Sequence, residues 1–371
     1  MNMKKKIISL ILLLFIQKVA IASGTTSYNF LKLNLGAKAL AMGEAFVGDS
    51  SGDLSIFYNK AGLCKLNKIS FSFTHHSWFQ DINIESASFL YPFSENNGFG
   101  LGINCIDYGK IAAYDIDDNR VENVTADDLC IDIGYVHNIG SIFSKDFLCF
   151  SGIGIKYIKE TLQRHTASSF AVDIGILIPS EYFSLGLSCQ NLGNGAEFIE
   201  ERFELPFQLK AGISTPFIIR KDFTFNCDYV YCPKGENAVN IGMEYIFSNV
   251  LALRSGYVFK DIPGDRFRVG FGFLSKYVYF DYAYVPFGVL GNSHIISLTF
   301  NFPKRERVLT KKKRKIISYK LLNKAQKALK KKRFKRAIFY LKKAIDLFPE
   351  NTQAKTLLER TKDIVEIIKK K

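Results

Sequence analysis

The chain has 371 residues, of which 47% are hydrophobic and 14% aromatic, and its formal net charge is +15. This apolar content excludes disorder for the bulk of the chain, and the length allows more than one domain. Residues 1–22 carry four lysines and no acid, residues 23–302 carry 21 basic and 29 acidic residues, and residues 303–371 carry 25 basic and 6 acidic residues. The sequence therefore has three regions, and its basic character belongs to the two ends.

Residues 1–22 have the pattern of a secretory signal. Three lysines precede an apolar run from Ile7 to Ile16, and Ala20-Ile21-Ala22 fits the small-x-small cleavage pattern. A membrane anchor is the alternative, but this run is too short to span about 30 Å of hydrocarbon as a helix. We expect cleavage after Ala22 and export from the cytoplasm.

From residue 69 to 302, apolar and polar residues alternate with a period of two. Ile69, Phe71 and Phe73, for example, alternate with Ser70 and Ser72. This period indicates strands with one apolar face. We expect 14 such strands, near residues 69–78, 82–92, 97–108, 125–139, 146–159, 168–179, 182–191, 204–214, 221–232, 237–247, 251–259, 265–274, 276–286 and 292–302.

The lengths of these segments and of their connections favour a membrane barrel. Most segments exceed the usual strand of about five or six residues and approach the roughly 9–11 residues that a tilted strand needs to cross a bilayer. Long connections (109–124, 160–167 and 192–203) alternate with short ones, as in outer-membrane barrels. We therefore predict an all-β transmembrane barrel over residues 69–302, with its apolar face toward lipid and its polar face toward the lumen.

The polar face of these strands carries charges of both signs, which would lie inside the barrel. They could pair with a segment held in the lumen, or they could line a path for solutes. The presence of both signs favours the first interpretation, because buried charges need partners. The expected lumen charges are Asp132, Asp173, Asp228, Glu244, Arg254 and Arg268, together with Asp281, Lys156 and Lys210.

Residues 23–68 precede the barrel and are rich in glycine and small residues. The run Leu-Gly-Ala-Lys-Ala-Leu-Ala-Met-Gly-Glu-Ala-Phe-Val-Gly (35–48) and the run Asp-Leu-Ser-Ile-Phe-Tyr-Asn-Lys-Ala-Gly-Leu (53–63) together resemble the N-terminal motif of the PorV/PorQ group. That group belongs to the FadL-like outer-membrane barrels, and the resemblance covers about residues 24–302. The sequence departs from the motif at Lys60, where proline is expected, and at Glu44, where glycine is common.

The resemblance implies a 14-stranded barrel with residues 23–68 folded into the lumen as a hatch. Small residues would let the hatch backbone turn sharply and pack closely against the wall. The residues expected to form the hatch contacts and any ligand site are Gly36, Met42, Gly43, Phe46, Asn59, Ala61, Gly62 and Leu63.

Residues 303–371 form a different kind of region. Residues 303–316, which include the basic run Lys311–Lys315, are expected to be a linker, and residues 317–371 have helical periodicity with a stop at Pro349. Ala337, Ala344 and Pro349 resemble one tetratricopeptide repeat, which is fewer than such arrays need to be stable alone. An even strand number would place this tail in the periplasm. Its expected partner is a periplasmic or exported protein, with anionic lipid headgroups or the cell wall as alternatives, and nucleic acid is not expected.

The sequence contains no set of residues typical of an enzyme, a metal site or a cofactor site. His75 and His76 would point to opposite faces of a strand, and the acidic run 115–119 lacks the glycine and distal glutamate of a calcium-binding loop. The seven cysteines include no C-x-x-C pair, which leaves only a Cys227–Cys232 bridge open. We expect no enzymatic activity and no cofactor.

Two functions remain open. The FadL resemblance implies transport of hydrophobic or amphipathic small molecules across the outer membrane. The PorV resemblance implies a binding or scaffold protein that receives exported proteins there. An apolar site between hatch and wall would favour transport. A blocked polar lumen with an apolar patch near Phe198 and Phe203, or near Phe287 and Val289, would favour a scaffold.

Overall fold

The computed structural model describes residues 26–64, 68–94, 96–143, 147–180, 182–198, 201–216, 222–260, 266–303, 311–330 and 333–370. The expected signal at residues 1–22 lies outside the described residues. The chain divides into two compact units, Met1–Lys304 and Arg305–Lys371. Each unit is treated separately below.

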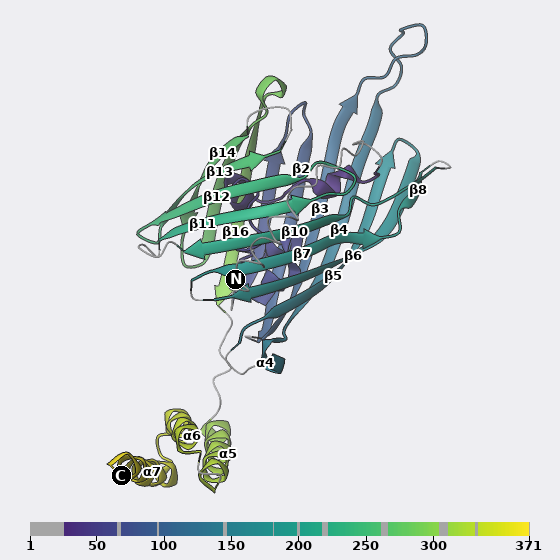
Figure 1. Ribbon diagram of the computed structural model, residues 1–371. Coiled ribbons are helices and arrows are strands. Elements are labelled where there is room, and N and C mark those ends of the chain that lie inside the picture. The colour runs from purple at the N-terminus through teal and green to yellow at the C-terminus, as the bar shows by residue number, and fades with distance from the viewer. Residues whose placement is uncertain are drawn as a thin grey trace, which may run out of the picture. The chain divides into compact units, whose positions relative to one another are not determined.

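The larger unit is a closed barrel of 14 antiparallel strands, as predicted (Figure 1). Strand β1 (Lys68–Ser77) closes the barrel by pairing with β16 (Asn292–Pro303). Every barrel strand matches a predicted segment to within four residues at each end. The others are β2 (Asn83–Ser94), β3 (Asn97–Ile111), β4 (Val124–Asn138), β5 (Phe150–Leu162), β6 (His165–Pro179), β7 (Ser184–Gly193), β10 (Gln208–Pro216), β11 (Phe223–Tyr231), β12 (Ala238–Phe247), β13 (Leu251–Phe259), β14 (Phe267–Leu274) and β15 (Val278–Pro286).

The strand register arranges the outer surface in rows of like character. Phe73, Ala87, Ile103, Ile131 and Tyr157 lie side by side on β1 to β5 and form one apolar row. Such a row is typical of the lipid-facing band of a transmembrane barrel. We call the end of the barrel that carries Lys68 and Pro303 the near end, and the opposite end the far end.

The next outward row toward the far end is polar. It contains His75, Glu85, Cys105 and Lys159, with Leu129 between the last two. His75 Nδ1 lies 2.5 Å from Glu85 Oε1, and both side chains are at least half exposed. The change from an apolar to a charged row marks the far-end edge of the apolar band on this side of the barrel.

The predicted long connection 192–203 contains a feature that the sequence did not predict. It forms a two-stranded ribbon of β8 (Ala196–Phe198) and β9 (Glu201–Phe203). Phe198 pairs with Glu201, and Phe203 pairs with Ala196. The described connections also contain α4 (Gly140–Phe143) and η3 (Gly288–Leu290).

The Cys227–Cys232 bridge that the sequence left open does not form, since both thiols are free. Cys227 lies within β11, while Cys232 follows the strand and is buried. Cys105, Cys130, Cys149 and Cys189 are free as well. The described cysteines therefore do not crosslink the barrel.

The described hatch, residues 26–64, consists of short helical turns instead of long elements. These are η1 (Asn29–Lys32), α2 (Ala37–Ala41), α3 (Ser55–Tyr58) and η2 (Lys60–Cys64). Helix α2 packs against β13 to β16, whereas η2 packs against β2 to β6. These two elements of the hatch therefore contact different arcs of the wall.

The smaller unit contains three helices, α5 (Lys311–Lys330), α6 (Phe334–Leu347) and α7 (Thr352–Lys370). Their core includes Leu322, Ala325, Leu341, Ala344 and Ala354. The expected linker is corrected in part, because the basic run Lys311–Lys315 is the first part of α5. Residues 304–310 lie outside the described part of the chain.

Candidate functional site

The candidate site is the interface between the hatch and the inner wall of the barrel. All eight hatch residues singled out from the sequence are buried there. The expected lumen charges are all buried as well, each with at most 6% of its surface exposed. The structure therefore brings the two predicted sets together inside the barrel.

Backbone contact holds the hatch close to the wall on the side of β10 to β13. Gly43 has a φ of +62°, and a Cβ there would lie 2.6 Å from the backbone nitrogen of Tyr257. A Cβ on Gly48 would lie 2.7 Å from the carbonyl carbon of Ile213. No side chain fits at such separations, so both positions require glycine.

The first charged cluster joins η2 to β4, β5 and β6. Lys60 Nζ lies 2.6 Å from Asp132 Oδ2 and 2.8 Å from Asp173 Oδ2, and it also donates to the carbonyl oxygen of Ile56. Lys156 Nζ lies 2.9 Å from the same oxygen of Asp173. Two ammonium groups and two carboxylates therefore share one buried site, and Lys60 is the group that the hatch supplies.

The second charged cluster lies on β12, β13 and β15. Arg254 donates from Nε to Glu244 over 2.7 Å and from Nη1 to Asp281 over 2.6 Å. Lys38 of the hatch lies 3.7 Å from Glu244 and 3.2 Å from Asp49. Burial alone would lower the pKa of Lys38, but the Asp49 and Glu244 carboxylates outweigh it and raise this pKa.

A third contact pairs Glu44 of the hatch with Arg268 of β14. Glu44 Oε1 accepts a hydrogen bond from Arg268 Nη1, and Glu44 Oε2 accepts one from Asn34. Glu44 has a φ of +68°, a backbone conformation that suits glycine. This side chain therefore occupies a strained position, and its carboxylate pairs with a guanidinium that is only 4% exposed.

Polar wall groups also bind the hatch backbone. Asp228 Oδ2 accepts hydrogen bonds from the backbone N–H groups of Phe46 and Val47, at 2.6 and 2.7 Å. Asn226 donates to the carbonyl oxygen of Ala45. A hatch side chain also binds the wall backbone: Asn59 donates to the carbonyl oxygen of Ile176 over 3.1 Å.

Asp53 is a hatch carboxylate held by hydroxyl groups. Ser70 of β1 and Ser88 of β2 donate to its two oxygens, at 2.9 and 2.6 Å. Burial raises the pKa of Asp53, and these two hydrogen bonds act against that rise. The sequence analysis did not single out Asp53, because its partners are uncharged.

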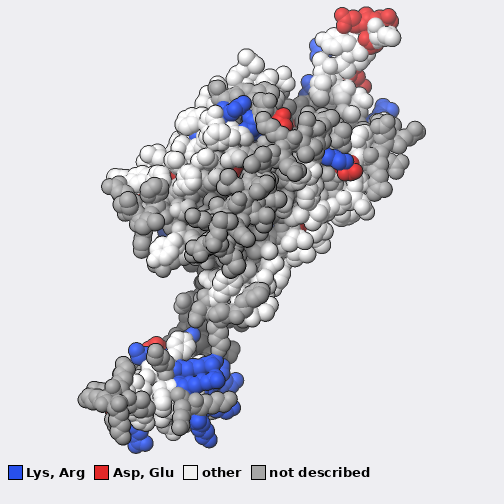
Figure 2. All heavy atoms as spheres, in the orientation of Figure 1, with Lys and Arg blue, Asp and Glu red and all other residues white. Residues whose placement is uncertain are grey.

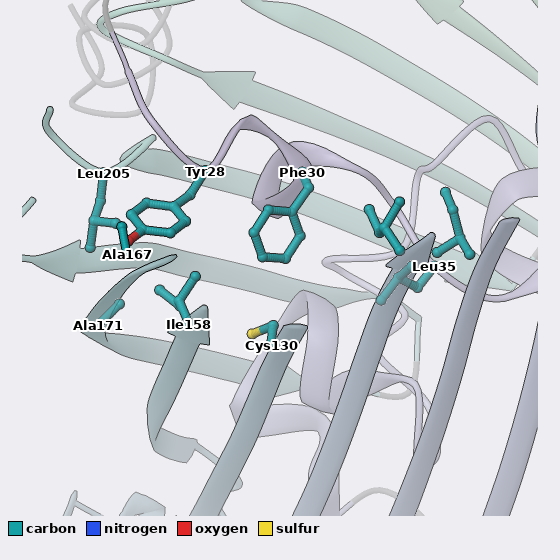
Figure 3. Packing of buried hydrophobic residues seen from close by; sticks show 10 residues of the cluster. Tyr28, Phe30, Leu35, Cys130, Ile158, Ala167, Ala171 and Leu205 are labelled. Atoms are coloured by element: carbon teal, nitrogen blue, oxygen red, sulfur yellow. The ribbon is translucent and has the colours of Figure 1, made fainter. Parts of the chain in front are cut away.

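The far end of the lumen contains an apolar cluster that the sequence analysis missed. Tyr28, Phe30 and Leu35 of the hatch pack there against inward-facing residues of the wall (Figure 3). Leu205 lies between β9 and β10. Each of the other wall residues stands in the polar phase of its strand, where an isolated apolar residue is the signal that could have revealed it. The buried members of this far-end cluster are Tyr28, Phe30, Leu35, Ile84, Ile106, Cys130, Ile158, Ala167, Ala171 and Leu205.

Aromatic residues of the rim lie next to the far-end cluster. Trp78, which packs against it, has ring-centroid distances of 4.4 Å to Phe79 and 6.1 Å to Phe287. Two residues further along, Val289 is fully exposed. One of the two apolar patches considered from the sequence therefore exists at the far-end rim.

His75 and His76 point to opposite faces of β1, as predicted. His75 faces outward and pairs with Glu85, while His76 faces inward and contacts Ser293 Oγ at 2.7 Å. Within the described ranges, no group of three histidine, cysteine or acidic side chains could hold a metal ion. None of the described helices is long and apolar enough to cross a membrane.

No protein-family model and no curated protein matches this chain. Solved structures do match. The Pseudomonas putida toluene transporter TodX is 12% identical with a TM-score of 0.55, covering 77% of this chain and 100% of its own. The monoaromatic hydrocarbon channel CymD is 12% identical with a TM-score of 0.55, and the match covers 76% of this chain and 100% of CymD. The Ralstonia pickettii toluene transporter TbuX is 13% identical with a TM-score of 0.50, and the match covers 72% of this chain and 98% of TbuX. At these identities, the likeness shows a shared fold.

Proposed function

We propose that this protein is an outer-membrane channel that admits small hydrophobic molecules. The observation that carries the proposal is the far-end cluster, in which the wall presents Ile84, Ile106 and Ile158 to the lumen. A barrel lumen is ordinarily polar, so the membrane does not require apolar residues at these positions. Their partners are Tyr28, Phe30 and Leu35, which belong to the hatch and not to the wall.

Displacement of the first part of the hatch would uncover this apolar surface. Each buried isoleucine side chain returned to water costs about 1.5–3 kcal/mol, which a small apolar ligand could offset by binding in its place. A molecule without charge or hydrogen-bonding groups meets this requirement best. The substrate class is therefore small hydrophobic compounds, in keeping with the fold neighbours TodX, a toluene transporter, and CymD, a monoaromatic hydrocarbon channel.

Passage through the barrel also requires the middle of the hatch to move. Lys60, Lys38 and Glu44 tie the hatch to charged groups of the wall. We assign these contacts to the closed state, in which they hold the hatch within the lumen. A ligand that enters from the far end would reach them after it has displaced Tyr28 and Phe30.

The same proposal fixes a location for each region. Residues 1–22 would direct export, the far end would face the outside, and the helical unit would lie in the periplasm as a tetratricopeptide-like hairpin. The motifs at 35–48 and 53–63 support membership of the PorV/PorQ group. No enzymatic step is proposed, since the fold neighbours named above are transporters or channels.

The proposal can be tested with the single tryptophan of the chain, Trp78, as reporter. Purified protein in detergent is titrated with toluene while the Trp78 emission is recorded. We expect a saturable change, because Trp78 packs against the far-end cluster. Ile158→Ser should weaken the apparent affinity at least tenfold, about 1.4 kcal/mol.

Ile155→Ser is the matched control. Ile155 lies on the same strand but on its outward face, where 57% of it is exposed. It should bind toluene as the unaltered protein does. A response without saturation, or an equal loss in both variants, would rule out the far-end cluster as the ligand site.

A scaffold for exported proteins is the second candidate, and the rim patch favours it. Val289 is fully exposed beside Phe287, whose ring lies 5.3 Å from that of Phe79. If this patch receives an exported protein, Val289→Asp should abolish its co-purification while toluene binding remains. Co-purification that survives Val289→Asp would contradict a role for this patch.

A further inference from the structure

The helical unit carries a pocket whose charged residues are all basic. The pocket has a volume of about 390 Å³ and lies between α5 and α6. Its lining consists of Lys324, Lys327, Ala328, Lys330, Arg333, Arg336 and Tyr340. Five of these seven residues are cationic, and none is acidic.

The helical periods explain how these residues converge. Lys324, Lys327 and Ala328 stand at spacings of three and four on α5 and therefore share one face. Arg333 precedes α6, and Arg336 and Tyr340 follow it at spacings of three and four. The two faces meet across the turn between the helices, with the half-buried Tyr340 and the buried Ala328 as the apolar part of the lining.

The charges of the pocket have few opposite charges nearby in sequence. Helix α5 contains no acidic residue, and the one acidic residue of α6 is Asp346, next to the last residue of that helix. Like charges at these helical spacings repel and destabilise a helix by a few tenths of a kcal/mol per pair. Figure 2 shows basic side chains gathered over α5. An anion in the pocket would relieve this repulsion.

Within the pocket, guanidinium groups and an aromatic ring lie together. Arg336 Nε lies 3.3 Å from the Tyr340 hydroxyl, and its guanidinium carbon is 6.0 Å from the centroid of that ring. Arginine binds phosphate oxygens through two parallel hydrogen bonds, while lysine adds point charge. This combination suits a compact anion with several charges better than a single carboxylate.

The backbone adds a smaller favourable contribution. The first turn of α7 is capped, because Asn351 Oδ1 accepts a hydrogen bond from the N–H of Ala354. The first turn of α6 has no side-chain cap and no acidic residue. Its free N–H groups lie at the same turn as Arg333 and Arg336, where a helix N-terminus favours negative charge.

We propose that this pocket, termed the basic pocket, binds a phosphate-bearing ligand that carries at least two negative charges. The ligand is recognised by its phosphate, which either a soluble phosphorylated molecule or the headgroup of an anionic lipid would supply. This binding site is independent of the channel function proposed for the barrel.

The test uses the full chain in neutral detergent and isothermal titration calorimetry at low salt. Pyrophosphate probes the soluble source, and dihexanoyl phosphatidic acid, a phosphomonoester that can carry two negative charges, probes the lipid source. Dihexanoyl phosphatidylcholine and citrate are the zwitterionic and carboxylate controls. We expect one site per chain for pyrophosphate, for the anionic lipid or for both, with affinity that falls as salt rises.

Two double variants that each remove two positive charges distinguish binding in the basic pocket from nonspecific electrostatic attraction to the helical unit. Lys327→Gln with Arg333→Gln removes two charges from the pocket and should weaken binding at least tenfold. Lys342→Gln with Lys343→Gln removes two exposed charges of α6 outside the pocket and should weaken it less than threefold.

Comparison of the two phosphate probes identifies the source of the ligand. Tighter binding of pyrophosphate supports the soluble source, and tighter binding of the anionic lipid supports the headgroup. Equal losses in both double variants would overturn the pocket as the site. Equal affinity for citrate would overturn phosphate recognition, and no binding by either phosphate probe would overturn the proposal as a whole.

Discussion

Charged residues are buried and paired with opposite charges in the lumen, whereas on the helical unit they are exposed and mostly of one sign. In the lumen, Lys60 is 1% exposed and lies within 3 Å of two carboxylates. On the helical unit, Lys324, Lys327 and Lys330 are exposed and surrounded by charges of their own sign. Buried charges of both signs fasten one part of a protein to another, whereas exposed charges of one sign are available to a ligand. The net charge of the chain, which averages these two regions, describes neither.

The largest expected effect comes from Lys60→Met. It leaves Asp132 and Asp173 buried with less compensation, and removing one partner of a buried ion pair costs about 3–5 kcal/mol. The hatch should open more often, so trypsin should cleave at Lys32 and Lys38 more than a hundredfold faster, because cleavage follows the open population. Cleavage is followed by mass spectrometry on the reconstituted protein.

Lys210→Met is the matched control for this experiment. Lys210 is also a buried lumen lysine, with 5% exposed, but it makes no ion pair with any described residue. Its removal should change the cleavage rate less than tenfold. Similar rates for the two variants would mean that Lys60 does not fasten the hatch.

A smaller effect is expected for Glu44→Gly. The change relieves a left-handed backbone conformation, worth about 1 kcal/mol, but it leaves Arg268 buried without its carboxylate. We expect a net loss of about 1–3 kcal/mol, measured as a lower midpoint of thermal unfolding. Gln80→Gly, at an exposed and uncharged residue with a φ of +54°, should leave the midpoint unchanged or raise it. A higher midpoint for Glu44→Gly would show that strain outweighs the ion pair.

The smallest effect is expected on the helical unit. Lys327→Gln should change its free energy of unfolding by no more than about 0.5 kcal/mol, and in the stabilising direction, because it removes repulsion between like charges. The measurement is loss of helical circular dichroism from the full chain in urea at low salt. Destabilisation beyond 1 kcal/mol would mean that Lys327 stabilises the fold of the helical unit, as the paired charges of the lumen stabilise the hatch.

Much of the barrel could be predicted from the sequence, because one face of each strand must suit lipid and the other must suit the lumen. The alternation at Ile69 to Thr74 is a direct consequence of this requirement, and the structure confirms it. The ribbon of β8 and β9 could not be predicted in the same way. Its strands have three residues each, which is too short for a period to become visible.

The site was only partly predictable. The charged residues could be assigned to the lumen, but their partners depend on which strands the hatch faces. Lys60 and Glu44 stood out only as departures from a motif, and the structure shows that each brings a charge to an oppositely charged wall residue. The far-end cluster was missed because single apolar residues in the polar phase, such as Ile84 and Ile106, do not disturb the alternation from which the strands are predicted.

The hatch has a further consequence for how the barrel is assembled. It precedes β1 in the chain, yet it packs against both β2 to β6 and β13 to β16, the two arcs on either side of the β1–β16 seam. These contacts lie inside the closed ring on both sides of the seam, so the hatch adds a second link between the first and last strands beside their own pairing. Closure of the barrel and docking of the hatch therefore stabilise one another.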